Sequence, residues 1–200
     1  MISISSLTVS RDGKKVLSEF SQEIPGKSAT LLSGPNGAGK TSLISAIAGT
    51  LKPIHGEIAI SGKNPYQSTP LDLARCRSVA PQRRIFTLAY TVGEVVNFVP
   101  KSLRIGDPER IYSALGLDEL WSKKVTELSI GQQQRVSLGL ALNQNSDFYL
   151  LDEPFDAQDS HFQHEILELI SDLKKTKGVL VVSHNTDALH PYFDQEIVLT

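Results

Sequence analysis

Eight residues near the start of the chain, Gly34–Thr41 (GPNGAGKT), place glycines, a lysine and a threonine at the spacing G-x-x-x-x-G-K-[ST]. Glycines let the backbone approach a phosphate closely, and the free N–H groups at the start of the following helix attract the anion. The pattern predicts that Lys40 reaches the β- and γ-phosphates of a nucleotide and that the Thr41 hydroxyl ligates Mg²⁺. A glycine-rich turn that merely begins a helix is the alternative. It accounts for neither the lysine nor the threonine.

A second group of chemically capable residues ends an apolar run, Phe148–Glu153 (FYLLDE). An aspartate at the end of such a strand, here Asp152, helps to hold Mg²⁺ in nucleotide-hydrolysing proteins with a P-loop. The next residue, Glu153, is placed to orient or deprotonate a water that attacks the γ-phosphate. An acidic strand end that faces solvent is the alternative, and the P-loop earlier in the chain favours the metal site.

The elements around the P-loop must form a strand, a loop and a helix for the motif to work. The segment Ala29–Ser33 is expected to be a short buried strand, and 41–51 has apolar residues at helical spacing. Upstream, alternating segments predict an antiparallel β-layer with a turn at Asp12-Gly13. Its expected strands are Ile2–Val9, Val16–Leu17 and Phe20–Ile24, and a further short strand is expected at Glu57–Ile60.

The second half of the chain alternates between helical and strand patterns, which argues for a parallel sheet with helices on both faces. Helices are expected at 131–143 and 159–176, and strands at Phe148–Leu151, Val179–Val182 and Glu196–Leu199. Residues 67–125 show mostly helical patterns. We therefore expect one α/β domain, 1–200, with a P-loop core, a mainly parallel sheet, the antiparallel layer and an inserted helical subdomain at roughly 83–145.

Composition narrows the functional classes. The net charge of −2 gives no electrostatic reason to expect binding to nucleic acid. One cysteine, Cys76, cannot form an internal disulfide, and no run of 18 apolar residues is present to span a membrane.

Four further motifs make the chain resemble the ATP-binding cassette (ABC) ATPase family over essentially its whole length. Leu128–Gln132 (LSIGQ) is similar to that family's signature, and Ala80–Gln82 is similar to its Q-loop. Asp156–Asp159 stands where the family's D-loop follows a Glu-Pro pair, and Val181–His184 resembles the strand that carries its switch histidine. The motifs follow the family's order along the chain.

The resemblance implies that two subunits sandwich two ATP molecules head to tail, as a homodimer or a heterodimer. Glu153, His184 and Gln82 would then be catalytic, while Thr41, Gln82 and Asp152 would hold Mg²⁺. Ser129, Gly131 and Gln132 would contact the ATP of the opposing subunit, and Asp159 would act across the interface. The nucleotide would be held by Gly34, Pro35, Asn36, Gly37, Ala38, Gly39, Lys40, Thr41 and Ser42.

The chain departs from the family at two informative places. The third signature position is Ile130 instead of glycine, and a β-branched residue narrows the backbone choices there. The family usually stacks an aromatic residue on adenine from the hairpin that here reads Ser10–Gly13. Arg11 could lie flat on the base instead, because a guanidinium stacks on π faces. This leaves the choice between ATP and GTP open.

The ATPase subunit of a membrane transporter is the favoured interpretation. The resemblance then implies a transmembrane permease on a separate chain and a cytoplasmic location, peripheral on the membrane face. A helix of that permease would dock near Gln82 and the following Ile85–Leu88. A soluble ABC-type ATPase of translation or DNA repair is the alternative, but those proteins carry two cassettes or a long insertion. A P-loop kinase would have no use for the signature. The importer and exporter classes are not separated by this reasoning.

Overall fold

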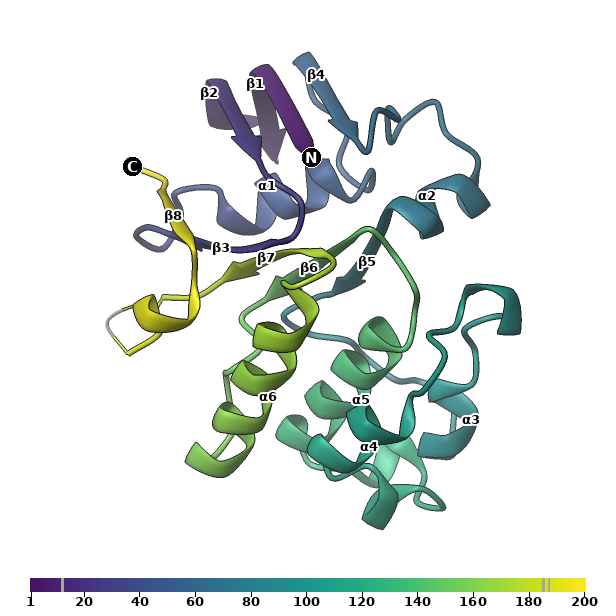
Figure 1. The fold of residues 1–200 in the computed structure, drawn as a ribbon. Coiled ribbons are helices and arrows are strands. Elements are labelled where there is room, and N and C mark those ends of the chain that lie inside the picture. Colours follow the sequence, from purple (N-terminus) through teal and green to yellow (C-terminus); the bar gives the residue numbers. More distant parts are fainter. Residues whose placement is uncertain (12, 185, 187) are drawn as a thin grey trace.

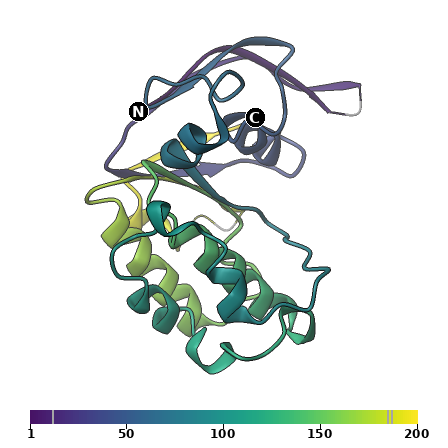
Figure 2. The same ribbon diagram turned by 90° about the vertical axis from the view of Figure 1, so that its right-hand side faces the viewer.

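The computed structural model describes residues 1–11, 13–184, 186 and 188–200. A three-stranded antiparallel sheet lies above helix α1, which lies above a five-stranded sheet, and further helices cover the lower face of that second sheet (Figure 1). Turned by 90°, the same arrangement separates into a sheet-rich upper part and a helical lower part (Figure 2). The expected α/β fold with an antiparallel layer is confirmed.

The antiparallel sheet has the strand order β2-β1-β4, with β1 at Ile2–Arg11, β2 at Lys14–Ile24 and β4 at His55–Ile60. The expectation of two separate segments in place of β2 was wrong. The register between β1 and β2 shifts several times, and Glu19 takes a positive φ of 52°. Such bulges interrupt the alternation of buried and exposed residues, so one strand has the sequence pattern of two. Asp12 of the predicted turn lies outside the described residues.

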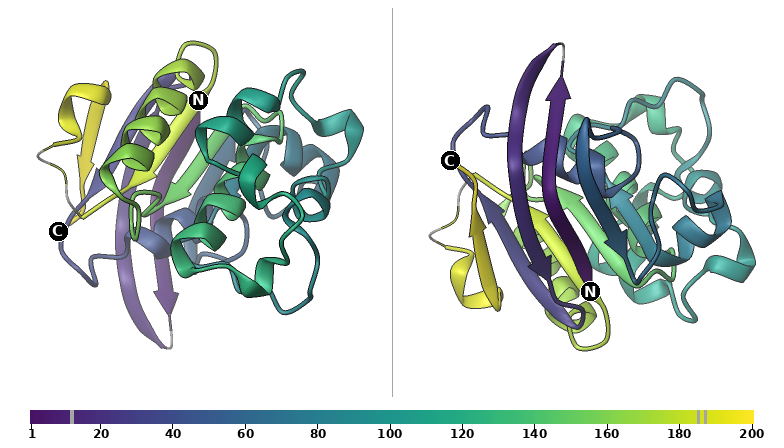
Figure 3. Two further views of the ribbon diagram at one scale, coloured as in Figure 1. Left: turned by 90° about the horizontal axis from the view of Figure 1, so that it is seen from below. Right: turned by 90° about the horizontal axis from the view of Figure 1, so that it is seen from above.

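All pairings in the five-stranded sheet, order β5-β6-β7-β3-β8, are parallel. The central strands β3, β6 and β7 are buried along their whole length, as expected for a sheet covered on both faces. The antiparallel strands pass across this sheet at an angle, and α6 lies on its opposite face (Figure 3). The strands run Ser28–Ser33 (β3), Arg77–Ala80 (β5), Phe148–Asp152 (β6), Gly178–Val182 (β7) and Gln195–Val198 (β8).

Strand β5 was not expected, because its four residues lie in the segment that we expected to be mostly helical. Among the described strands it pairs with β6 alone, and it forms the edge of the sheet. Its position matters for the site, since the Q-loop begins where β5 ends.

The helices agree with the predicted positions but end earlier. Helix α1 ends at Ile47 instead of Leu51, because Gly49 takes a φ of +81° and its N–H turns back to the Ala46 carbonyl. Helix α6 ends at Leu173 instead of 176, where the N–H groups of Thr176 and Lys177 both bond to the Leu173 carbonyl. The α-helices are Lys40–Ile47 (α1), Pro70–Cys76 (α2), Val92–Val96 (α3), Glu109–Ala114 (α4), Ile130–Leu142 (α5) and Ser160–Leu173 (α6). Short 3₁₀ turns occur at Lys101–Leu103, Asp118–Leu120, Val125–Glu127 and His190–Tyr192.

The parallel sheet separates two hydrophobic cores. One fills the space between α1, the antiparallel sheet and the upper face, and includes Leu43, Ile60 and Leu180. The other lies between the lower face and α5, α6 and the smaller helices, and includes Tyr149 and Val136. Both cores anchor β6, which carries the acidic strand end. Within the described residues, none of the helices is long and apolar enough to cross a bilayer.

Candidate nucleotide-hydrolysis site

The phosphate loop connects β3 to α1, so its backbone enters the helix at the carboxyl edge of the parallel sheet. Gly34, Gly37 and Gly39 have φ angles of +135°, +90° and +96°, which side chains other than glycine rarely adopt. A Cβ at Gly34 would collide with the Leu199 carbonyl, and one at Gly39 would lie 2.9 Å from the Val16 carbonyl oxygen. Two of the three glycines are therefore required by space as well as by conformation.

Lys40 is buried at the first position of α1, and its ammonium closes the loop. Its Nζ donates to the Gly34 carbonyl at 2.6 Å and to the Pro35 carbonyl at 3.0 Å. A small cavity of about 260 Å³ beside this loop is lined by Arg11, Val16, Gly37, Gly39, Lys40, Thr41 and Ser42. The structure thus places Arg11 next to the phosphate loop, and its contact with the nucleotide base stays a prediction.

Asp152 ends β6 and is only 3% exposed, yet its Oδ1 has no hydrogen-bond partner among the described residues. Burial raises the pKa of Asp152 to about 6, against the hydrogen bond from Thr41, and the adjacent Glu153 carboxylate adds to the rise. A buried carboxylate with a free oxygen beside a hydroxyl fits a hard divalent cation such as Mg²⁺.

The raised pKa of Asp152 predicts a pH dependence of stability. Between about pH 4 and about pH 6 the folded protein holds a proton that the unfolded chain has released, so this carboxyl makes stability fall as pH rises. The resulting loss of unfolding free energy reaches about 3 kcal/mol, and it does not occur in Asp152→Asn, whose amide does not titrate. We expect urea unfolding in EDTA to show wild type losing stability relative to Asp152→Asn from about pH 4 to about pH 7. A difference that does not change with pH would contradict the assignment.

Glu153 follows directly and is held in an unusual conformation. Its φ is +51°, its N–H bonds to the Val182 carbonyl at 3.0 Å, and its side chain is buried. Its Oε2 lies 3.1 Å from Nδ1 of His184 and 3.3 Å from the His184 N–H. The neighbouring loop places Asp156 Oδ1 at 3.9 Å from the same Nδ1. The structure therefore brings together the glutamate and the histidine, which are 31 residues apart.

Asp156 was not among the site residues that we expected from the sequence. Glu153, Asp156 and His184 each offer a ligand atom, and these atoms lie within 4.8 Å of one another. The hydrogen bonds between Glu153 and His184 already account for part of this proximity. The spacing of Asp156 after the strand end, inside the D-loop, is the signal that could have identified it.

The signature residues lie at the start of α5. Ser129 caps this helix: its Oγ accepts from the Gln132 N–H at 3.3 Å, and Gln132 Oε1 accepts from the Ser129 N–H at 3.0 Å. Ile130 is 75% exposed, so it is not packed into this subunit. Of the residues that the structure describes, none from the signature lines the cavity at the phosphate loop. The helix start is thus exposed and separate from the phosphate cavity.

Two of the predicted site residues, Gln82 and Asp159, have positions that do not by themselves indicate a role at the site. Gln82 is exposed in the loop after β5, and the larger cavity that contains Thr41 and Asp152 is lined by its neighbour Pro81 instead. Asp159 caps α6, where its Oδ1 accepts from the Phe162 N–H at 3.0 Å. That bond accounts for an aspartate at this position without any partner.

A phosphate loop and a buried acidic strand end on the same edge of a parallel sheet define a P-loop nucleotide-hydrolysing protein. The pattern of the ABC transporter family matches residues 17–156, which is more than half of the chain. The chain belongs to the ABC transporter family. It is an ATPase, the ATP-hydrolysing subunit of a membrane transporter.

Relatives and solved structures agree with this assignment. The manganese transport system ATP-binding protein of Bacillus subtilis strain 168 is 34% identical over 99% of this chain and 82% of the relative. A hemin import ATP-binding protein of Shewanella denitrificans is 32% identical, covering 100% of this chain and 84% of the relative. A dimeric bacterial ABC transporter cassette superposes with a TM-score of 0.83 at 25% identity, covering 100% and 94% of the two chains.

Proposed function

We propose that two copies of this chain, or this chain and a similar one, enclose two ATP molecules head to tail. The observation that carries the proposal is the division of the site within one subunit. The phosphate loop, Asp152, Glu153 and His184 form one part, while the start of α5, with the exposed Ser129 and the half-buried Gly131, forms another. A helix N-terminus attracts an anion, so the second part suits the γ-phosphate held by a partner subunit.

In this arrangement the residues of one subunit have different roles. Lys40 and the loop N–H groups from Asn36 to Ser42 would bind the phosphates, and Thr41, Asp152 and Gln82 would hold Mg²⁺, which when bound neutralises phosphate charge. Glu153 accepts the proton of the attacking water, and His184 is hydrogen-bonded to Glu153 and orients that water. Asp159 would act across the interface. Catalysis of this kind depends on positioning and charge, with little covalent chemistry for the protein.

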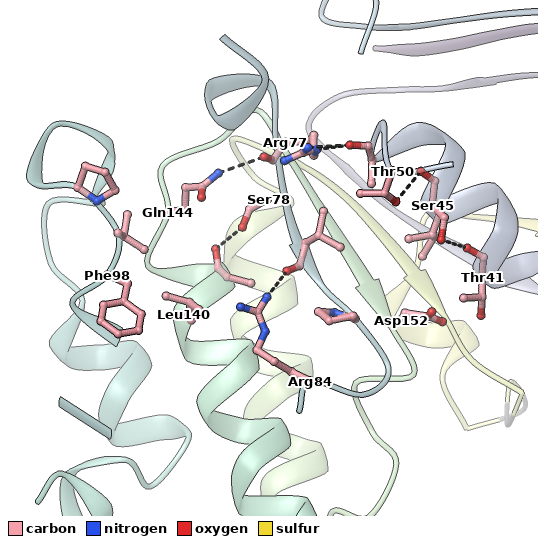
Figure 4. A pocket seen from close by; sticks show the side chains of 17 residues that line it. Thr41, Ser45, Thr50, Arg77, Ser78, Arg84, Phe98, Leu140, Gln144 and Asp152 are labelled. Carbon is pink, nitrogen blue, oxygen red and sulfur yellow. Dashed lines mark hydrogen bonds between the residues drawn. The ribbon is translucent and has the colours of Figure 1, made fainter. Parts of the chain in front are cut away.

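The permease contact is proposed at the larger cavity, of about 500 Å³, between α1, β5 and the helical segment that we assign to roughly 83–145. Thr41 and Asp152 lie at one end of this cavity and Phe98 at the other (Figure 4). Ile85, Leu88 and Phe98 are large apolar side chains that remain 84%, 60% and 55% exposed. A permease helix that covers this region would sense the metal end of the site directly, and the chain would lie on the cytoplasmic face of the membrane.

The transported compound is proposed to be a metal ion or a metal chelate that is taken up. Relatives that match at 28–34% identity are named for manganese, zinc, hemin and cobalamin transport. The permease and its binding partner select the compound, so this proposal concerns the system and not a pocket on this chain.

The experiment that tests the transporter assembly is purification of the tagged chain from detergent-solubilised membranes of its source cells. Recovery of a multispanning membrane chain in stoichiometric amount is expected. Loss of that chain from an Ile85→Asp, Leu88→Asp variant would support docking at the proposed surface. Retention of the permease by this variant would contradict the surface, and recovery of ribosomal or DNA-bound partners alone would contradict the assembly.

The position of Arg11 predicts that this residue contributes to binding of the nucleotide base. Arg11→Ala is expected to weaken ATP binding roughly 5- to 30-fold, because a guanidinium stacked on a base contributes about 1–2 kcal/mol. Affinity for tripolyphosphate, which has no base, should stay the same. Isothermal titration with ATP, GTP and tripolyphosphate separates the two contributions. An equal loss for ATP and tripolyphosphate would place Arg11 on the phosphates instead of the base.

A further inference from the structure

Two glutamine side chains connect the start of the signature helix to the backbone of Glu153. Gln134 lies three residues after Gly131 on α5, and its Nε2 donates to the Glu153 carbonyl at 2.6 Å. Its Oε1 accepts from Nε2 of Gln158 at 3.3 Å, and that same nitrogen lies 3.2 Å from the Gly131 carbonyl oxygen. The path therefore runs from the Gly131 carbonyl through two side-chain amides to the Glu153 peptide.

A hydrogen bond to the Glu153 peptide helps to fix the orientation of the Glu153 side chain. A residue other than glycine at positive φ persists only when its surroundings hold it there. The Glu153 N–H donates to the Val182 carbonyl, and the Glu153 carbonyl accepts from Gln134 Nε2 at 2.6 Å and from the Asp156 N–H at 3.2 Å. This backbone orientation aims the carboxylate at His184, so loss of the Gln134 bond, the shorter of the two to the carbonyl, would loosen the carboxylate from the position that an attacking water requires.

Close packing makes the connection stiff. A Cβ at Gly131 would lie 2.5 Å from the Ala157 carbonyl oxygen, so the first turn of α5 rests directly on the loop that follows Glu153. Gln158 Nε2 also lies 3.2 Å from the Asp156 carbonyl oxygen in that loop. A displacement of the α5 start would therefore be passed to the loop instead of being absorbed in a gap.

We propose that Gln134 and Gln158 are positioning residues that couple the signature of a subunit to its own Glu153. The inference rests on the proposed head-to-tail dimer, in which the signature contacts the ATP of the partner while Glu153 serves the ATP of its own subunit. Occupancy of one site then orients the glutamate of the other. Gln134 fixes the glutamate, and Gln158 transmits the position of the signature to Gln134.

The test compares Gln134→Met, Gln158→Leu and the matched control Gln133→Met in steady-state ATPase assays. Gln133 is also half-buried on α5 and donates to a backbone carbonyl, that of Leu128 at 3.0 Å, but within the described part of the chain it makes no hydrogen bond to Glu153 or to the loop that follows it. Gln134→Met is expected to lower kcat roughly tenfold with ATP affinity within about twofold, and to bring the Hill coefficient to about 1. Gln158→Leu should lower the Hill coefficient while kcat stays within about threefold, and Gln133→Met should change neither.

The outcomes distinguish a failure of the coupling through Gln134 and Gln158 from a failure of the proposed dimer. If the wild type is cooperative and both Gln134→Met and Gln158→Leu keep the wild-type kcat and Hill coefficient, the proposed coupling through Gln134 and Gln158 is overturned. The proposed dimer is not affected by that result. Wild type with a Hill coefficient of about 1, and no ATP-driven dimer, would overturn the proposed dimer, and the kcat of Gln134→Met would still test the positioning of Glu153. Thermal unfolding of each variant checks folding. If Gln134→Met does not fold, the Hill coefficient of Gln158→Leu decides, because this residue is on a loop and only half-buried.

Discussion

Glu153→Gln is expected to slow ATP hydrolysis by at least about 100-fold while ATP binding is retained, since loss of a general base typically costs 10²–10⁴-fold. The amide has nearly the same shape and can still accept the hydrogen bond that the carboxylate receives from the His184 N–H at 3.3 Å. It cannot take a proton from water. The ATP-bound sandwich should therefore accumulate, because the step that opens it is blocked.

Two measurements check this result: single-turnover phosphate release, and the mass of the protein in solution with and without Mg-ATP. Glu168→Gln is the matched control, because Glu168 carries the same charge on the exposed side of α6. It should hydrolyse ATP at the wild-type rate. A Glu153→Gln protein that stays monomeric in saturating Mg-ATP would contradict the head-to-tail sandwich, and one that hydrolyses normally would remove Glu153 from its role.

Lys40→Ala is expected to weaken nucleotide binding by roughly 100-fold, because a charged hydrogen bond contributes about 1.5–3 kcal/mol and Lys40 would make bonds to two phosphates. The substitution also removes the bonds that Lys40 donates to the Gly34 and Pro35 carbonyls, so the loop itself loses support. Both effects act on the same step, the binding of the phosphates.

Titration calorimetry with ATP in the Glu153→Gln background measures this affinity without hydrolysis. Lys52→Ala serves as the control, since Lys52 is exposed and lies after the end of α1. Thermal unfolding separates a damaged loop from a damaged fold. Unchanged affinity in a folded Lys40→Ala protein would contradict the role of this lysine.

The strand, loop and helix around Gly34–Thr41 could be predicted from the sequence because the requirement is local. Glycines at positive φ, the lysine at the helix start and the apolar strand before them lie within a few residues of one another. The same holds for Asp152, which ends a wholly buried run of five residues, and for Glu153, which follows it directly. The family resemblance added His184, Gln82 and the signature residues, which spacing alone could not have connected.

Short or irregular elements could not be predicted in this way. Strand β5 has four residues, two of them partly exposed, and it exists because it pairs with β6. Strand β2 has bulges that disturb its alternation, so its continuity depends on β1. In both cases the hydrogen-bonding partner, distant in sequence, stabilises the strand, and a window of neighbouring residues carries little information about it.

By itself the sequence determined the phosphate loop, the acidic strand end and the alternation that builds the parallel sheet, because each follows from backbone geometry and burial over a short span. Only the tertiary structure decided that Oε2 of Glu153 lies 3.1 Å from Nδ1 of His184 and that Gln134 donates to the Glu153 carbonyl. It also decided that Oδ1 of Asp152 is buried with no hydrogen-bond partner in the described part of the chain. These facts depend on the strand order β5-β6-β7-β3-β8 and on the packing of α5 against the loop after β6. The physical reason is that contacts between distant segments are selected by the burial of both hydrophobic cores together, which no local pattern encodes.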